Sequence, residues 1–179
     1  MLATPIRAFP FLLLLTLVAL APPPAWAQGW QAQNLPPLPA GESYSATTVS
    51  ATSATHVWVA GHVAPDYDAF VARSLDGGAT WTLVHRGPSY GITRIVMLND
   101  QVGFLGGIWG LFRKTTDGGV TWTQETSDLC CPNPTPPVLP HNVGPDGHVY
   151  GLAVADEHHI WTAGYDGYSA GVIYHRVPG

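Results

Sequence analysis

A segment of 11 residues occurs twice in this chain of 179 residues. Residues 74–84 read SLDGGATWTLV and residues 115–125 read TTDGGVTWTQE, so the two aspartates lie 41 positions apart. Asp-Gly between two alternating segments is a strong signal for a hairpin turn, because glycine tolerates a positive φ. The aspartate can accept hydrogen bonds from nearby backbone N–H groups, and the tryptophan after it supplies apolar surface. A turn that recurs at this spacing predicts a recurring structural unit.

Two further patterns recur upstream of these turns. The segments HVWVAG, VGFLGG and HIWTAG end at Gly61, Gly107 and Gly164, each with an aromatic residue three positions earlier. The strand-like segments SYSATTVS, ITRIVML and HVYGLAV precede them, separated by short polar turns. One unit therefore contains four antiparallel strands in about 45 residues, which is the content of a propeller blade. We predict an all-β fold built from propeller-type blades of four antiparallel strands.

The third unit ends early. Aligning VIYHRVPG with LFRKTTDGG places Pro178 at the position of Asp117, so this unit lacks its Asp-Gly-Gly turn and its outer strand. We therefore predict about two and three-quarter blades, an incomplete propeller, because closed propellers have at least four blades. Three explanations stay open. The first, which we favour, is that the chain is a truncated piece of a longer propeller. The second is that the chain closes a ring with copies of itself. The third is that it forms a small open array of sheets, whose open edges would allow self-association.

The segments SLDGGATW and TTDGGVTW resemble the Asp-box, the Ser/Thr-x-Asp-x-Gly-x-Thr-Trp signature also called the BNR repeat. Together with the aromatic-x-x-Gly strands, they make residues 42–179 resemble exported propellers related to the photosystem II assembly and stability factor. Sialidases and some other glycoside hydrolases also carry Asp-boxes. The resemblance implies that each box is a structural turn between the third and fourth strands of a blade. It implies structural roles for Ser74, Asp76, Gly78, Thr80, Trp81, Thr115, Asp117, Gly119, Thr121 and Trp122.

The N-terminus has the three-part pattern of a secretory signal peptide. Arg7 precedes the apolar run FPFLLLLTLVALA, and the small residues of AWA predict cleavage after Ala27. The run is shorter than the ~20 residues of a membrane span, so we expect an exported protein, periplasmic or extracellular, without membrane insertion after cleavage. The rest is predicted as a Pro-rich entry segment at 28–41, blades at about 42–88, 89–128 and 148–179, and a Cys/Pro-rich insertion at 129–147.

The predicted mature chain is acidic and poor in charge. Residues 28–179 hold six Lys and Arg residues against 12 Asp and Glu residues, a formal charge of −6. Nucleic-acid binding needs clustered basic residues that neutralise phosphates, so we expect no nucleic-acid partner. Charged residues make up only 11% of the chain while turn formers and aromatic residues are frequent, which favours strands over helices.

Strand order predicts two opposite edges of the blades. The Asp-Gly-Gly turns lie on one edge, and the loops between second and third strands lie on the other. Those loops, HVAPDYDA, GIWG and GYDGYSAG, carry aromatic residues, two of them beside carboxylates, which suits stacking of a carbohydrate or another ligand. Loops are also rich in Tyr, Asp and Gly for turn geometry alone. The candidate ligand residues are Asp66, Tyr67, Asp68, Trp109, Tyr165, Asp166 and Tyr168.

The two cysteines of the chain, Cys130 and Cys131, are adjacent. In an exported protein a vicinal disulfide would stiffen the inserted loop, and bonds to other chains or two free thiols are the alternatives. Eight histidines are scattered without the convergent spacing of a zinc site, and we interpret them as solvated turn residues. We predict no metal and no cofactor.

The sequence shows no complete catalytic set. A sialidase needs an arginine cluster and a tyrosine–glutamate pair, yet glutamate occurs only at positions 42, 125 and 157. A general glycosidase needs two carboxylates across a cleft. We therefore predict a non-catalytic exported repeat protein that binds or scaffolds a protein or a glycan, and leave enzymatic activity open. The alternatives are an N-terminal fragment of a secreted, sialidase-like Asp-box glycoside hydrolase, with catalytic residues beyond residue 179, and a non-functional open-reading-frame remnant.

Overall fold

The computed structural model describes residues 29–88, 91–108, 111–125, 148–165 and 171–176. The chain divides into two units, residues 1–32 and residues 33–179, and the strands belong to the second. Every regular element in the described ranges is a β-strand. None of the described residues forms a helix that is long and apolar enough to span a membrane.

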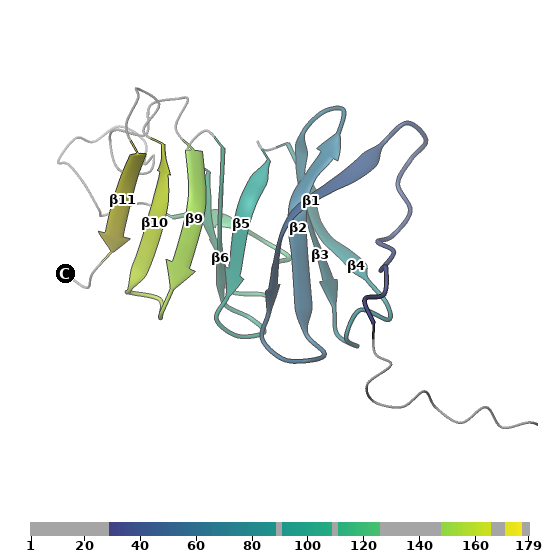
Figure 1. Ribbon diagram of the computed structural model, residues 1–179, viewed down its shortest axis with the longest axis horizontal. Helices are drawn as coiled ribbons and strands as arrows, with labels where there is room; N and C mark the ends of the chain where they lie inside the picture. The colour runs from purple at the N-terminus through teal and green to yellow at the C-terminus, as the bar shows by residue number, and fades with distance from the viewer. Residues whose placement is uncertain (1–28, 89–90, 109–110, 126–147, 166–170, 177–179) are drawn as a thin grey trace, which may run out of the picture. The chain divides into compact units, whose positions relative to one another are not determined.

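The strands form three antiparallel sheets in which each strand pairs with the next one along the chain (Figure 1). Blade 1 contains β1 (Ser43–Ala51), β2 (Val57–Ala64), β3 (Asp68–Ser74) and β4 (Thr82–Gly87). Blade 2 contains β5 (Ile92–Met97), β6 (Gly103–Gly107), β7 (Phe112–Thr115) and the short β8 (Thr123–Gln124). Blade 3 contains β9 (His148–Val154), β10 (Ile160–Tyr165) and β11 (Gly171–Arg176). The prediction of an all-β fold of propeller-type blades with an incomplete third blade is confirmed.

A bulge in the first strand of each blade explains the recurring glycine of each second strand, which ends β6 but lies inside β2 and β10. The pairing of the first two strands shifts by one residue, which leaves Thr47, Thr93 and Tyr150 as the extra residues of the three blades. The bulge pushes a carbonyl of the first strand against the second strand. A Cβ added at the facing glycine would come closer to that carbonyl than real Cβ atoms do, which holds for Gly61, Gly107 and Gly164. The aromatic-x-x-Gly pattern therefore marks a close backbone approach.

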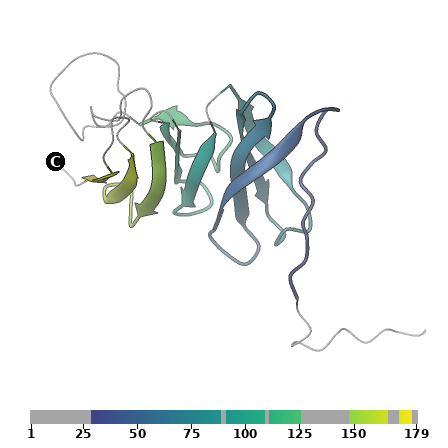
Figure 2. The ribbon, with the colours of Figure 1, turned by 45° about the horizontal axis from the view of Figure 1, so that its top comes forward.

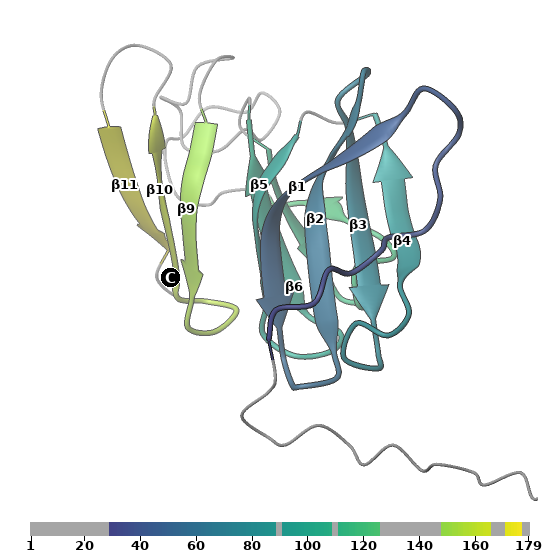
Figure 3. The ribbon, with the colours of Figure 1, turned by 45° about the vertical axis from the view of Figure 1, so that its right-hand side comes forward.

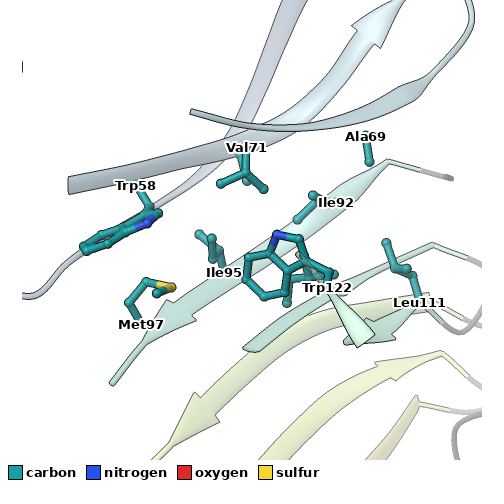
Figure 4. Close-up of a cluster of buried hydrophobic side chains, with 10 residues drawn as sticks. Trp58, Ala69, Val71, Ile92, Ile95, Met97, Leu111 and Trp122 are labelled. Carbon is teal, nitrogen blue, oxygen red and sulfur yellow. The ribbon is translucent and has the colours of Figure 1, made fainter. Parts of the chain in front are cut away.

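Successive blades stand side by side, with β1 next to β5 and β5 next to β9 (Figures 1 and 2). We call the face of a blade that is directed toward the next blade its trailing face, and the opposite face its leading face. The trailing face of blade 1 packs on the leading face of blade 2 through an apolar cluster that includes Trp58, Val71, Ile92, Ile95 and Trp122 (Figure 4).

The junction between blades 2 and 3 repeats this arrangement. Phe104 and Phe112 on the trailing face of blade 2 pack against Val149 and Ile160 on the leading face of blade 3. Phe104 takes the register position of Trp58, because both lie three residues before the recurring glycine of their strand. Each junction therefore buries an aromatic residue of one blade on the aliphatic face of the next, at an apolar gain of about 25 cal/mol per Å².

The leading face of blade 1 is covered by residues 33–42 of the same chain (Figure 3). Leu35 and Leu38 pack against the buried residues Val63, Phe70 and Ala72. The sequence predicts only a Pro-rich entry segment here, and its part in the core is visible only in the structure. The described segment therefore shields the part of the leading face formed by β2 and β3, while Val49 of β1 on the same face is 65% exposed.

Candidate ligand-binding edge

The two edges of the blades differ in what their residues do. We call the edge with the Asp-Gly-Gly turns and the turns between first and second strands the turn edge. The loop edge is the opposite one, with the loops that connect second and third strands at 65–67, 108–111 and 166–170. Residues 109–110 and 166–170 lie outside the described residues, so the loop edge is described here from blade 1 and from the strand ends of blades 2 and 3.

On the turn edge the first aspartate of the repeat is fully engaged. Ser74 Oγ donates to Asp76 Oδ1 at 2.8 Å, while Thr80 donates its backbone N–H to Oδ1 at 2.9 Å and its hydroxyl to Oδ2 at 2.6 Å. Ser74 Oγ also accepts the backbone N–H of Gly78 at 2.8 Å. Gly77 and Gly78 have φ values of 72° and 94°, which side chains other than glycine rarely adopt.

The second turn has the same network. Thr115 Oγ1 donates to Asp117 Oδ1 at 2.8 Å, and Thr121 donates its backbone N–H and hydroxyl to the two carboxylate oxygens at 2.9 and 2.5 Å. Gly118 and Gly119 have φ values of 74° and 92°. Hydrogen bonds therefore explain why Ser or Thr, Asp, Gly and Thr recur at these offsets.

These hydrogen bonds stabilise the charged carboxylates. Donation from Thr80 and Ser74 lowers the pKa of Asp76 to about 2. Burial raises the pKa of Asp117, but hydrogen bonds from Thr121 and Thr115 outweigh it, and its pKa is also about 2. Both side chains are ionised and saturated with donors near neutral pH, so they are poorly suited to act as an acid or to bind a ligand.

The turn of blade 2 is also a docking point for blade 1. Trp58 Nε1 donates to Gly118 O at 2.9 Å, and Trp122 Nε1 donates to Gly119 O at 3.0 Å. In blade 2, Trp122 thus closes its own turn, whereas Trp58 of the preceding blade holds that turn from the other side. The turn edge is built for contact between blades.

Ionic contacts complete the junctions near the turn edge. Asp100 accepts hydrogen bonds from Thr52 at 2.5 Å and pairs with His56 at 2.6 Å, joining blade 2 to blade 1. These contacts, the Thr52 hydrogen bond first, hold the pKa of Asp100 below its usual range. Lys114 and Glu157 form the corresponding ion pair between blades 2 and 3, with a distance of 2.6 Å between Nζ and Oε2.

Tyr67 is the most unusual residue of the loop edge. Its φ of 61° is the left-handed conformation, which is rare for a bulky residue other than glycine. Its side chain is 57% exposed, and its ring stacks on His62 with 4.7 Å between the ring centroids and 21° between the planes. The loop thus presents an aromatic ring to solvent in a conformation that costs about 1–3 kcal/mol.

Asp68, beside Tyr67, is committed to structure. Arg86 Nη2 lies 3.3 Å from Asp68 Oδ2, and Arg86 Nη1 lies 2.6 Å from Glu42 Oε2, with all three side chains partly buried. The arginine ties the starts of β1 and β3 to the end of β4. Asp66 lies in the loop itself and is exposed to solvent.

Blade 3 adds aromatic residues to the same edge. Tyr165 ends β10 and stacks on His148 at the start of β9, with 6.4 Å between the ring centroids. His148 also contacts Tyr150, whose side chain is 52% exposed and which the sequence analysis missed. No ring contact among the described residues joins Tyr165 to Tyr67 of blade 1.

Several predicted residues fall outside the description. Trp109, Asp166 and Tyr168 of the candidate ligand set lie in the undescribed parts of their loops, as do Cys130 and Cys131 in the insertion. Within the described ranges, no three His, Cys, Asp or Glu side chains lie close enough together to hold a metal ion. The interpretation of the histidines as solvated turn residues is wrong for the four that lie in strands, which are His62, His85, His148 and His175. Burial and Arg113 lower the pKa of His85.

Comparison with known proteins identifies no family for this chain. No family model matches the chain, and no curated protein matches it. Among solved structures, one described as YCF48 bound to D1 peptide matches with 17% sequence identity and a TM-score of 0.46. The match covers 73% of this chain and 39% of that chain, so the present chain spans well under half of that protein. The function is therefore argued from the chain's own residues.

Proposed function

We propose that this chain is an exported, non-catalytic repeat protein that binds a protein or a glycan through its loop edge. The Asp-box assignment, the export and the nature of the partner are all parts of this proposal. Export rests on the signal-peptide pattern of residues 1–27. An exported product that begins at Gln28 by mass spectrometry would support that part, and an intact Met1 would contradict it.

The single observation that carries the proposal is the conformation of Tyr67. A strained residue persists when its surroundings impose it, and such residues are frequent at ligand-binding positions. Tyr67 is strained, exposed and stacked on His62, so its ring has a fixed orientation before any partner arrives. An aromatic platform fixed in advance loses little entropy on binding a sugar ring or an apolar side chain.

The contrast between the edges supports the same proposal. On the turn edge the carboxylates of Asp76 and Asp117 are saturated by hydrogen bonds within their own turns. On the loop edge the exposed side chains include the aromatic rings of Tyr67 and Tyr150 and the carboxylate of Asp66. A non-catalytic role also fits the use of Asp68, since its ion pair with Arg86 occupies a carboxylate that glycoside hydrolysis would need free.

A binding test uses two probes, a glycan array and a displayed library of random peptides. We expect a ligand from one of them to lose at least about tenfold in affinity for Tyr67→Asn, because asparagine tolerates the left-handed backbone but lacks the ring. Val120→Asn is the matched control, since Val120 is 47% exposed on the turn edge. Equal losses in both variants, or none in Tyr67→Asn, would contradict a loop-edge site.

A panel of fluorogenic glycosides separates this proposal from the alternative of a glycoside hydrolase fragment. The proposal predicts no turnover of any glycoside by the purified chain, including sialosides. Turnover that is lost in Asp66→Asn would overturn the non-catalytic assignment, because it would place a catalytic carboxylate on the loop edge.

A further inference from the structure

The junction between blades 1 and 2 places a partly buried histidine beside an arginine. His85 of β4 pairs in register with Val71 of β3, which is 0% exposed on the trailing face of blade 1. Directly opposite residues of an antiparallel pair point to the same side of the sheet, so the imidazole of His85 is directed toward blade 2. Its neighbour Val84 also packs on the apolar cluster of this junction (Figure 4).

Arg113 faces the histidine from blade 2. It lies in β7 opposite Leu105 of β6, which is 2% exposed and belongs to the cluster between the two blades. Arg113 is partly buried, and its charge acts on His85. None of the ion pairs among the described residues includes Arg113. The junction therefore holds a cation that no described carboxylate neutralises.

The other described groups around His85 supply no free negative charge. The turn of blade 2 presents the backbone carbonyl of Val120, and β8 contributes the uncharged Gln124 at the position opposite the arginine. The carboxylate of Asp117 in that turn is held by donors within the turn itself. Arg86, which follows His85 on β4, pairs with the two carboxylates described above on the opposite face of the sheet.

A neutral imidazole suits this place, and an imidazolium does not. Burial disfavours the charged ring and Arg113 repels it, and both lower the pKa of His85 below its ordinary value of 6.5. The Val120 carbonyl acts in the opposite sense without outweighing them. We propose that protonation of His85 loosens the packing of blade 2 on blade 1, so that this junction opens in mild acid while blade 3 stays folded.

The direction of the effect follows from comparing the folded and unfolded chains. The unfolded chain takes up a proton at His85 near pH 6.5, whereas the folded junction resists it. The stability that the neutral ring contributes is therefore present above pH 6.5 and is lost as the pH falls below that value. His56 of the same junction has the opposite surroundings, because it pairs with Asp100 and its protonation adds an attraction. The inference concerns the packing of blades and does not depend on the proposed function.

The first measurement is an NMR titration of the histidine rings in the whole chain, with His85→Gln used to assign the signal. We expect His85 to titrate below pH 6.5 in the native protein and closer to 6.5 in Arg113→Gln, which lacks the repelling cation. A ring that only filled space would not respond to Arg113. Titration of His85 at or above 6.5, or an unchanged titration in Arg113→Gln, would overturn the proposal.

Hydrogen exchange tests whether the junction itself opens. The amides of Ile95 and Met97 donate to side chains of blade 1 across the junction, so their protection reports on its packing. We expect their protection factors to fall at least about threefold between pH 7 and pH 5 in the native protein, and to stay constant in His85→Gln. The amides of the β9–β10 ladder should keep their protection in both proteins.

His56→Gln is the matched control, because it changes the other histidine of this junction and leaves His85 beside Arg113. The loss of protection at Ile95 and Met97 in acid should persist in this variant. A loss that is absent from the native protein, remains in His85→Gln, disappears in His56→Gln, or extends equally to the β9–β10 ladder would in each case contradict a switch at His85.

Discussion

Trp58 in blade 1 and Trp161 in blade 3 occupy the same register position, yet the first is fully buried and the second is 37% exposed. The difference comes from the neighbour. Trp58 packs on blade 2 and donates to Gly118 O, whereas no blade follows Trp161 in the described chain, and its ring stacks on His175 instead. The repeat therefore determines which type of residue occupies this position. The neighbouring blade determines how far that residue is buried and how much it stabilises the fold.

The largest expected effect comes from truncating these two tryptophans. Trp58→Ala removes a buried ring and leaves the Gly118 carbonyl without its donor, so we expect a loss of about 3–5 kcal/mol in the free energy of unfolding. Trp161→Ala should lose no more than about 1 kcal/mol, since its ring is partly solvated. Urea unfolding of the two purified variants and the native protein gives both values. Similar losses would break the comparison, because they would mean that both faces are buried alike.

The Asp-Gly-Gly turns could be predicted from the sequence because the residues that form their hydrogen bonds are close together along the chain. Within each Asp-Gly-Gly turn the donors to Asp76 and Asp117 lie two to four residues away, so the repeat contains the whole network. The recurring glycines of the second strands were visible as a pattern. Their physical cause was not, because the bulge residue in the first strand lies 14 residues before each glycine.

The contacts between blades could not be predicted in the same way. Trp58 and Gly118 are 60 positions apart, and their hydrogen bond depends on how one sheet packs on the next. Leu35 and Leu38 belong to a Pro-rich segment whose composition gave no sign that it covers blade 1. On the loop edge, Asp68 was predicted as a ligand residue, but Arg86, 18 positions later, engages it.

Replacing the aspartates of the two repeated turns should lower stability unequally. The pKa of Asp76 and that of Asp117 lie at about 2, below the ordinary 3.8, so their hydrogen bonds stabilise the fold above pH ~4 and lose this effect as the pH falls toward 2. The turn that contains Asp117 also accepts the hydrogen bond of Trp58, so weakening it also weakens a contact between blades. The turn that contains Asp76 belongs to blade 1 and does not receive this hydrogen bond. We therefore expect Asp117→Asn to lower stability by about 1–2 kcal/mol at pH 6, and Asp76→Asn to lower it less.

Urea midpoints measured between pH 6 and pH 2.5 would check this ordering. Each variant should also show a flatter decline in acid than the native protein, because it lacks one carboxylate that must be protonated. A native midpoint that rises as the pH falls would have the wrong sign for the hydrogen bonds described here.

The smallest effect concerns the ion pair between blades 2 and 3. Lys114 and Glu157 lie 2.6 Å apart, but Glu157 is 45% exposed, so the pair should contribute about 0.2–1 kcal/mol. A double-mutant cycle with Lys114→Met and Glu157→Gln, repeated at high salt, measures this coupling. A coupling above about 2 kcal/mol would show that this junction depends on charge more than on Phe104 and Phe112.

Hydrogen exchange at two amides tests the packing of one blade on the next most directly. The N–H groups of Ile95 and Met97 in β5 donate across the junction to the side chains of Thr48 and Ser50 in β1, at 3.2 and 2.9 Å. The account predicts that both amides exchange as slowly as those inside the β5–β6 ladder, and that Ser50→Ala speeds exchange at Met97 in particular. Fast exchange of both amides in a folded native protein would contradict it, because blades 1 and 2 would then not be packed together in solution.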